Sequence, residues 1–364
     1  MTIHIPLDRS TFGFEKRTLL RSGAFTVSGW TYPSGVIAVS LENERGGLII
    51  LPFMGQMIWS AVFDGQDLRM TSVFDQPVPS PTILGTYGCF MFHAGLLRNG
   101  CPGPDDTHPL HGEMPCARMD EAWLEISEDG SALTLGGIYR HVEGFGNRYD
   151  ATPSVTLRAG EATFDIGMDV LNRGGKSMDL MYMAHANYAY VPDGTFVEPL
   201  GVGEIRVRTS VPAHVHPTDQ WRDYIAKLAR DPRLMRKLDS PAMYEPEIVS
   251  FLGDVGTDQG GNAHFFLRHP DGAAFYTRYA PEDFTHATRW VLHDPDYHVA
   301  GFVLPATCDP EGYLAESRKG NVRQLSPGQK ASFSVHTGLL NAQEYDATLA
   351  GLDQETSSRN STGN

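Results

Sequence analysis

The sequence contains little cysteine and little positive charge, and each shortage excludes a class of protein. Its four cysteines, Cys89, Cys101, Cys116 and Cys308, are too few and too irregularly spaced for a zinc ribbon or a disulfide framework. We therefore expect free thiols in a reducing compartment. The 44 acidic residues outnumber the 29 Lys and Arg residues, which gives a net charge of -15. A nucleic-acid partner needs clustered Lys and Arg, so we expect none.

Long apolar segments are also missing. No apolar run approaches the roughly 20 residues that a membrane-spanning helix needs. Residues 1–9 contain no apolar core of a secretion signal. From the sequence we therefore expect a cytoplasmic protein with no membrane partner.

The residues that are abundant favour β-structure. Glycine (38 residues) and proline (24) are spread evenly along the chain, which is typical of many short strands joined by turns. The clearest alternation covers residues 162–171, where Phe164, Ile166 and Met168 would share one face of a strand. We predict an all-β protein built as a large sandwich or a closed β-structure.

One segment departs from this pattern. Residues 219–238 place apolar side chains at helical spacing, and Pro232 should end or restart the helix. We predict one or two short helices there, inserted in a single β-rich domain that spans residues 1–352. Residues 353–364 are polar, and we predict that they form a disordered tail without function.

Two segments that contain histidine indicate the chemistry: Pro109-Leu110-His111-Gly112-Glu113 and His185-Ala186-Asn187. Each lies next to a stretch with the pattern of a β-strand. Imidazole titrates near neutrality, and its two nitrogens can donate and accept hydrogen bonds at once. Two histidines on a β-scaffold can therefore bind sugar hydroxyls and move protons on and off them. We predict that the rings of His111 and His185 lie within one side-chain reach across a concave pocket.

A set of segments, in a particular order, carries a family resemblance. The set is Leu110-His111-Gly112, Val170-Leu171-Asn172, His185-Ala186-Asn187-Tyr188, Trp290, and Leu325-Ser326-Pro327-Gly328-Gln329. It resembles the galactose-mutarotase-like (aldose 1-epimerase) superfamily, and in particular a divergent branch of it. The resemblance implies a β-supersandwich with a short helical insert, whose concave face binds a monosaccharide or sugar derivative. It also implies an isomerase that interconverts anomers or epimers by acid/base catalysis without a cofactor.

The resemblance also implies roles for single residues. In this family an early histidine binds the sugar and a second histidine is the general acid, so His111 matches the first and His185 the second. An arginine precedes the first histidine in the family, and Arg98 is the nearest candidate here. The other predicted substrate-binding residues are Asn187, Trp290 and Tyr313, the last two because aromatic rings can stack on a sugar.

The general base does not match the family pattern. Related sequences place a glutamate, followed by proline, just after an apolar strand. Here that strand reads Gly301-Phe302-Val303-Leu304, so a leucine stands at the expected position. We predict that Glu311, in the loop that follows, is the base, with Asp309 and Glu316 as further candidates.

A divalent metal is an alternative to this site without a cofactor. His111 and Glu113 point the same way if their segment is extended, and with His185 they could form an N/O ligand set. Such a metal would suit isomerisation, epimerisation or elimination on a keto sugar. We favour the site without metal. A further pair, His214 and His216, lies beside prolines in a loop-like stretch, and we predict that both are surface residues.

A second alternative is a sugar-binding protein without catalytic activity. The leucine at the expected position of the base favours this alternative or a changed reaction. The presence of both His111 and His185 favours an enzyme.

Overall fold

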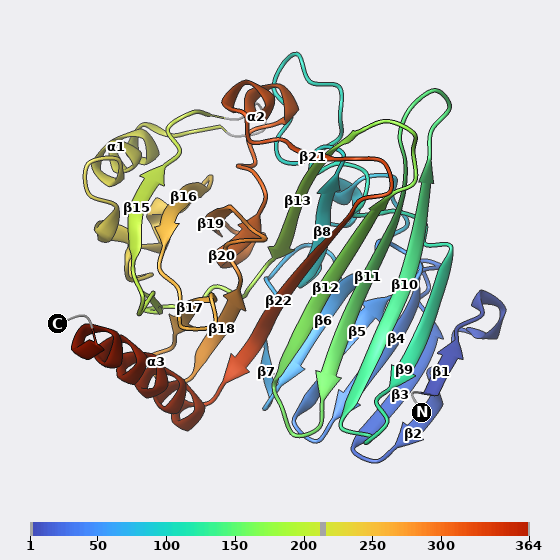
Figure 1. Cartoon of the computed structure of the whole chain (residues 1–364). Helices are drawn as coiled ribbons and strands as arrows, with labels where there is room; N and C mark the ends of the chain where they lie inside the picture. The colour runs from blue at the N-terminus through green and yellow to red at the C-terminus, as the bar shows by residue number, and fades with distance from the viewer. Residues whose placement is uncertain (1–2, 212–215, 363–364) are drawn as a thin grey trace.

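The computed structural model describes residues 3–211 and 216–362, and strands in two antiparallel sheets dominate its architecture (Figure 1). The sheet of nine strands, sheet A, runs in the spatial order β1 (Ile3–Pro6), β9 (Glu121–Ile126), β10 (Ala132–Val142), β11 (Arg148–Arg158), β12 (Thr163–Asn172), β22 (Lys330–Leu340), β18 (Ala274–Tyr279), β17 (Ala263–Arg268) and β14 (Thr195–Val197).

The sheet of 13 strands is sheet B. Its main path has the order β15 (Val202–Val207), β16 (Ile248–Val255), β19 (His286–His293), β20 (His298–Ala306), β13 (Met178–Ala186), β8 (Met91–Leu96), β6 (Met57–Phe63), β5 (Gly46–Leu51), β4 (Ile37–Asn43), β3 (Phe25–Thr31) and β2 (Arg17–Ser22). Two short strands pair at its side, β21 (Arg323–Leu325) with β13 and β7 (Gln66–Asp67) with β6. The predicted all-β class is confirmed.

Helices are few and short apart from the last. The α-helices are α1 (Asp219–Leu228), α2 (Tyr313–Lys319) and α3 (Ala342–Thr362), and the 3-10 helices are η1 (Arg9–Thr11), η2 (Ile83–Thr86), η3 (Pro232–Met235) and η4 (Pro241–Met243). Within the described residues, no helix has both the length and the hydrophobicity that crossing a membrane requires.

Alternation along β12 shows how the core forms between the sheets. Phe164, Ile166 and Met168 are buried, whereas the side chains between them are half-buried. Because successive side chains of a strand point to opposite faces, these apolar residues share the inner face. Phe164 stacks on Phe63 of β6, with ring centroids 5.9 Å apart, so sheet A and sheet B pack face to face.

The strand β13 shows which face of sheet B carries the candidate site. Tyr182 packs against Phe333 of β22, with ring centroids 4.9 Å apart, so this side of β13 faces sheet A. Met183 and His185 have the opposite parity and therefore point away from sheet A. Both are nevertheless buried, and they line a cavity together with residues of η2 and of the segments that precede α1 and β16.

The helical insert agrees with the pattern of the sequence. The side-chain oxygen of Thr218 accepts a hydrogen bond from the Trp221 amide and caps α1. Trp221, Ile225 and Leu228 are buried on one face of the helix. Pro232 stands at the start of η3, where its missing N–H costs nothing, so it restarts the helix as predicted.

The predicted disordered tail differs from the structure, because α3 continues through Thr362. The first half of α3 is anchored by Tyr345 and Leu352, which are buried against sheet A; the Tyr345 and Phe266 ring centroids are 5.3 Å apart. From this anchored half, α3 continues into the polar residues 353–362, because extending a formed helix costs less than starting one. Residues 363–364 lie outside the described part of the chain.

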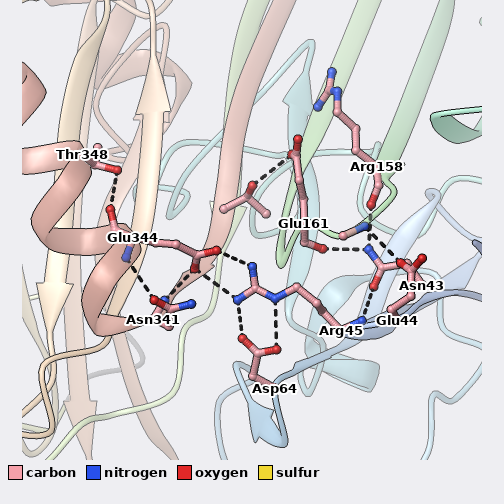
Figure 2. Close-up of polar contacts among 11 residues, drawn as sticks. Asn43, Glu44, Arg45, Asp64, Arg158, Glu161, Asn341, Glu344 and Thr348 are labelled. Carbon is pink, nitrogen blue, oxygen red and sulfur yellow. Dashed lines mark hydrogen bonds and ion pairs between the residues drawn. The ribbon is translucent and has the colours of Figure 1, made fainter.

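Ion pairs connect α3 to the hairpins of sheet B (Figure 2). Arg45, between β4 and β5, pairs with Asp64 and also with Glu344, whose Oε1 lies 2.5 Å from an Arg45 Nη atom. These two carboxylates raise the pKa of Arg45. Glu344 also accepts a hydrogen bond from the Asn341 amide at 2.9 Å, and the Glu344 amide donates to the Asn341 side chain at 3.0 Å. The start of α3 is therefore fixed both to its own cap and to the opposite sheet.

Candidate active site

The two predicted histidines meet on the outer face of sheet B. His185 comes from β13 and His111 from the loop after β8, and their ring centroids are 4.7 Å apart. Phe92 of β8 stacks on His185, with centroids 4.5 Å apart. Both histidines line a cavity of about 500 Å³, called here the histidine cavity, together with Glu247 and Trp290. The predicted proximity of the two rings is confirmed, and their roles stay predictions.

The backbone at His111 explains why a glycine follows it. His111 and Gly112 both have positive φ angles, 59° and 80°. A Cβ atom on Gly112 would lie 2.0 Å from the carbonyl oxygen of Arg98 and 2.7 Å from that of Gly95. Neither contact can be relieved by turning a side chain, because both partners are backbone atoms. Glycine at position 112 therefore allows the loop to place His111 in the cavity.

We expect Gly112→Ala to lower the free energy of unfolding by about 2–5 kcal/mol, since left-handed strain and overpacking combine. Urea unfolding measures this effect. Gly130→Ala is the matched control, because Gly130 has a φ of 72° but nothing within 4 Å of its added Cβ. This control should lose only about 1–2 kcal/mol, the cost of the conformation. Equal losses in the two variants would contradict the clash.

Hydrogen bonds fix the tautomer of His185. The Asn187 Nδ2 group donates to the carbonyl oxygen of Cys89 at 3.0 Å, so the Asn187 Oδ1 atom faces His185. This oxygen lies 2.9 Å from His185 Nδ1, which therefore carries the proton in the neutral ring. Burial lowers the pKa of His185 to about 4, although Asn187 and the charge of Glu247 act in the opposite direction. At neutral pH the ring is uncharged, with an accepting Nε2.

Glu247 is a site residue that the sequence analysis missed. Its carboxylate is largely buried, with 12% of the side chain exposed. The Trp290 indole N–H donates to Glu247 Oε2 at 2.8 Å, and Arg208 pairs with Oε1. Both donors suit the ionised carboxylate. The cavity therefore contains an acidic group close enough to His185 to affect its pKa.

Strand parity explains how Glu247 reaches the cavity. Glu247 immediately precedes β16, and Val249, two residues on, also lines the cavity and is the register partner of Trp290. Leu304 on β20 lines the cavity too, so the position where the family resemblance expects a glutamate does face the site. The carboxylate comes instead from β16, two strands away in sheet B. The sequence signal for this carboxylate is Glu245-Pro246-Glu247 directly before an apolar strand, whereas the family pattern places Glu-Pro after one.

Glu311, the predicted base, does not share the histidine cavity. Its carboxylate lies 2.5 Å from Lys319 Nζ, which also contacts Asp309 at 3.1 Å and Glu316 at 2.6 Å. Glu311 lines a different cavity of about 480 Å³. The cause is the path of the chain after β20, which turns towards α2 and so directs these carboxylates to the Lys319 ammonium. The prediction that Glu311 faces His185 is wrong in this structure.

The alternative metal set is not assembled either. Glu113 Oε1 accepts hydrogen bonds from two backbone N–H groups at the end of β8 and from the Tyr149 hydroxyl, at 2.7 to 3.0 Å. Among residues 3–211 and 216–362, one group brings three ligand atoms of His, Cys, Asp or Glu within 4.8 Å, and it is Asp309, Glu311 and Glu316. That group already holds the Lys319 ammonium.

Two further predicted residues lie elsewhere. Arg98 pairs with Asp179 at 2.9 Å and lies over the ring of Tyr313, 3.6 Å from its centroid. Neither Arg98 nor Tyr313 lines the histidine cavity. The reason is that the Arg98 guanidinium forms an ion pair with Asp179 at the start of β13. Trp290 does line the cavity, whereas Asn187 does not line it and instead accepts a hydrogen bond from His185.

The histidines predicted at the surface have different outcomes. His216 is exposed, as predicted, but it also lines the histidine cavity. His214 lies outside the described residues. Tyr87, Tyr297 and Asp294 also line the cavity, and no motif in the sequence distinguishes them from other tyrosines and aspartates.

Solved structures share this fold. A protein from Klebsiella pneumoniae, provisionally named an aldose 1-epimerase, matches with a TM-score of 0.80 at 14% identity, over 98% of this chain and 95% of its own. A galactose mutarotase-like protein from Clostridium acetobutylicum matches with a TM-score of 0.59 at 11% identity, over 87% and 99%. These identities establish the fold alone. The chain therefore has the galactose-mutarotase-like β-sandwich fold, as the resemblance implied.

Sequence comparison is less informative about activity. No curated protein matches the chain. A family model described as a domain of unknown function, DUF4432, matches residues 34–339. This match covers most of the sequence, and the chain therefore belongs to the DUF4432 family.

Proposed function

We propose that this protein is an isomerase that interconverts the anomers or epimers of a monosaccharide or sugar derivative in the histidine cavity. One observation carries the proposal: the His185 imidazole and the Glu247 carboxylate line the same cavity, and each is held by hydrogen bonds from the protein. The mutarotase-like fold supports a sugar as the substrate. The chemistry needs one group that accepts a proton and one that donates a proton.

Anomer interconversion gives each group a role. Glu247 removes the proton of the anomeric hydroxyl while the ring oxygen receives a proton that originates on His185. The bond between the anomeric carbon and the ring oxygen breaks, which leaves an open-chain carbonyl. After rotation, the ring closes on the other face and both protons return. His111 binds a sugar hydroxyl beside this pair, and the Trp290 ring is available to stack on the sugar.

The number of protons decides which form of the site is active. In the neutral ring the His185 proton is on Nδ1 and faces Asn187, so Nε2 has none to donate. The reaction therefore needs one added proton on the His185 and Glu247 pair. The negative charge of Glu247 favours that proton on His185. The active form is then an imidazolium beside a carboxylate.

The charges of the cavity favour an uncharged sugar. The described lining residues include no lysine, and their one arginine, Arg208, is paired with Glu247. Glu245 and Asp294 add further negative charge to the wall. A phosphate would meet like charge there, which costs several kcal/mol at an interface.

We expect NMR exchange spectroscopy to detect faster interconversion of the α and β anomers for some neutral aldoses, with D-galactose, D-glucose and D-xylose as the first panel. For D-glucose 6-phosphate we expect kcat/KM to be lower than for D-glucose by about tenfold or more, because of the like charges. The His185→Gln variant is the control for catalysis by the cavity. Binding of a panel sugar without accelerated exchange would instead support a sugar-binding protein.

A second function is favoured by the neutral state of His185. An uncharged imidazole with an accepting Nε2 can remove a proton next to the carbonyl of a keto sugar at neutral pH. Arg208 and the Trp290 indole would then stabilise the negative charge that this step leaves on the carbonyl oxygen of the sugar. Uptake of solvent deuterium at the carbon next to the carbonyl of D-fructose or D-xylulose, with no change in the anomer exchange of aldoses, would support this function over the first.

A further inference from the structure

A directed chain of hydrogen bonds runs from the core of sheet B to the histidine cavity. The Asn187 amide donates to the Cys89 carbonyl, and Asn187 Oδ1 accepts from His185 Nδ1. His185 Nε2 is then the acceptor, so the Tyr87 hydroxyl, 3.4 Å away, must be the donor. Each bond in the chain fixes the direction of the next. The proton at the cavity end of the chain therefore belongs to Tyr87 and not to His185.

The position of Tyr87 fits this order. It directly follows η2 and lines the histidine cavity, where it is only partly buried, whereas His185 is 3% exposed. The Tyr87 ring packs edge-on against Trp290 and Phe92, with centroids 5.9 and 5.5 Å apart. These contacts hold the hydroxyl over His185 Nε2. Burial also raises the pKa of Tyr87 well above its ordinary value, so the hydroxyl keeps its proton at rest.

We infer that the Tyr87 hydroxyl relays the proton between His185 and the sugar, an inference that rests on the proposed function. In ring opening, Tyr87 gives its proton to the ring oxygen as it takes the proton from Nε2 of the His185 imidazolium. One O–H bond and one N–H bond break, and two O–H bonds form, so Tyr87 is unchanged. Ring closure reverses both transfers. Tyr87 is then a catalytic residue, and Asn187 is a positioning residue that acts through His185.

The test is Tyr87→Phe, which removes one oxygen and keeps the ring contacts with Trp290 and Phe92. Tyr32→Phe is the control for loss of a tyrosine hydroxyl, because Tyr32 is half-buried beside Trp30 and does not line the histidine cavity. With the aldose that the parent enzyme turns over fastest, we expect kcat of Tyr87→Phe to fall by about 10²-fold or more, with KM changed little. We expect Tyr32→Phe to keep kcat within about threefold, as a group outside the site does.

A second readout separates the relay from a structural role. In mixtures of H₂O and D₂O, a plot of the rate of the parent enzyme against the deuterium fraction should curve below a straight line, because several protons move in one step. The same plot for the residual rate of Tyr87→Phe should be closer to a straight line. A Tyr87→Phe variant with unchanged kcat, or with only a raised KM, would overturn the relay. An unchanged kcat of Tyr87→Phe would still leave the proposed function in place if the parent enzyme is active and His185→Gln is impaired. A parent enzyme inactive on every sugar would instead contradict the proposed function.

Discussion

Glu247→Gln is expected to lower kcat/KM for anomer interconversion by about 10²–10⁴, the effect of removing one proton-transfer group. The substitution keeps the size of the side chain and one oxygen that can accept a hydrogen bond from Trp290 or Arg208. It removes the negative charge and the basic oxygen that accepts the anomeric proton. Sugar binding through the other cavity residues should remain. Anomer exchange by NMR gives the rate, and a ligand titration followed by NMR gives the affinity.

Glu311→Gln is the matched control for this experiment. Glu311 was predicted as the base from the sequence, but its carboxylate is paired with Lys319 outside the histidine cavity. We expect this variant to keep kcat/KM within about threefold of the parent, because a group outside the reacting centre changes the barrier little. Unfolding midpoints of both variants separate loss of chemistry from loss of fold. If Glu247→Gln were active and Glu311→Gln inactive, Glu311 in the loop after β20 would be the base instead of Glu247.

The second large effect is a fall of kcat/KM as pH rises. Burial lowers the pKa of His185 to about 4, and the active form needs the proton that this group loses. Above that pKa the protonated fraction drops about tenfold per pH unit, so we expect kcat/KM to fall about 10³-fold from pH 4 to pH 7. The measurement is the rate of anomer exchange against pH, corrected for the uncatalysed rate. His185→Gln should remove this dependence.

Stability changes with pH in the opposite direction. The pKa of His185 is lower in the folded protein than its ordinary value of 6.5, so neutral His185 contributes stability above pH 6.5. That contribution, about 3 kcal/mol, is lost progressively as the pH falls from 6.5 to about 4. Urea unfolding at each pH shows over which pH range the enzyme is folded, and the rates are compared within that range. A level rate between pH 5 and pH 8 would contradict the imidazolium and would favour His185 as a base on a keto sugar.

The sequence predicted the parts of the molecule that depend on local pattern. Alternation in residues 162–171 identified β12 and its buried face, and Pro232 marked the start of η3. The two histidines were identified because a histidine next to a strand, with glycine or asparagine beside it, has a recognisable pattern. Their proximity depends on the fold, because 74 positions separate His111 and His185 in the sequence.

The remaining site residues depend on partners that are distant in the sequence. Glu247 reaches His185 because β16 and β13 are separated by only two strands in sheet B, although 62 residues separate them in the chain. Glu311 and Arg98 have suitable side chains near the expected positions. Glu311 forms an ion pair with Lys319, however, and Arg98 forms one with Asp179. A pattern along the chain shows which groups are available. It does not show which ion pair each group forms.

The position of β22 has a consequence for biosynthesis. This strand is made after both of its neighbours, yet it lies between β12 and β18 in the middle of sheet A. Until Lys330–Leu340 leaves the ribosome, both neighbours keep a bare edge, and bare edges recruit strands from other chains. The nascent protein therefore exposes the edge of β12 while residues 173–329 are made and the edge of β18 while residues 280–329 are made. We expect chaperones that shield such edges to govern its yield in the cell.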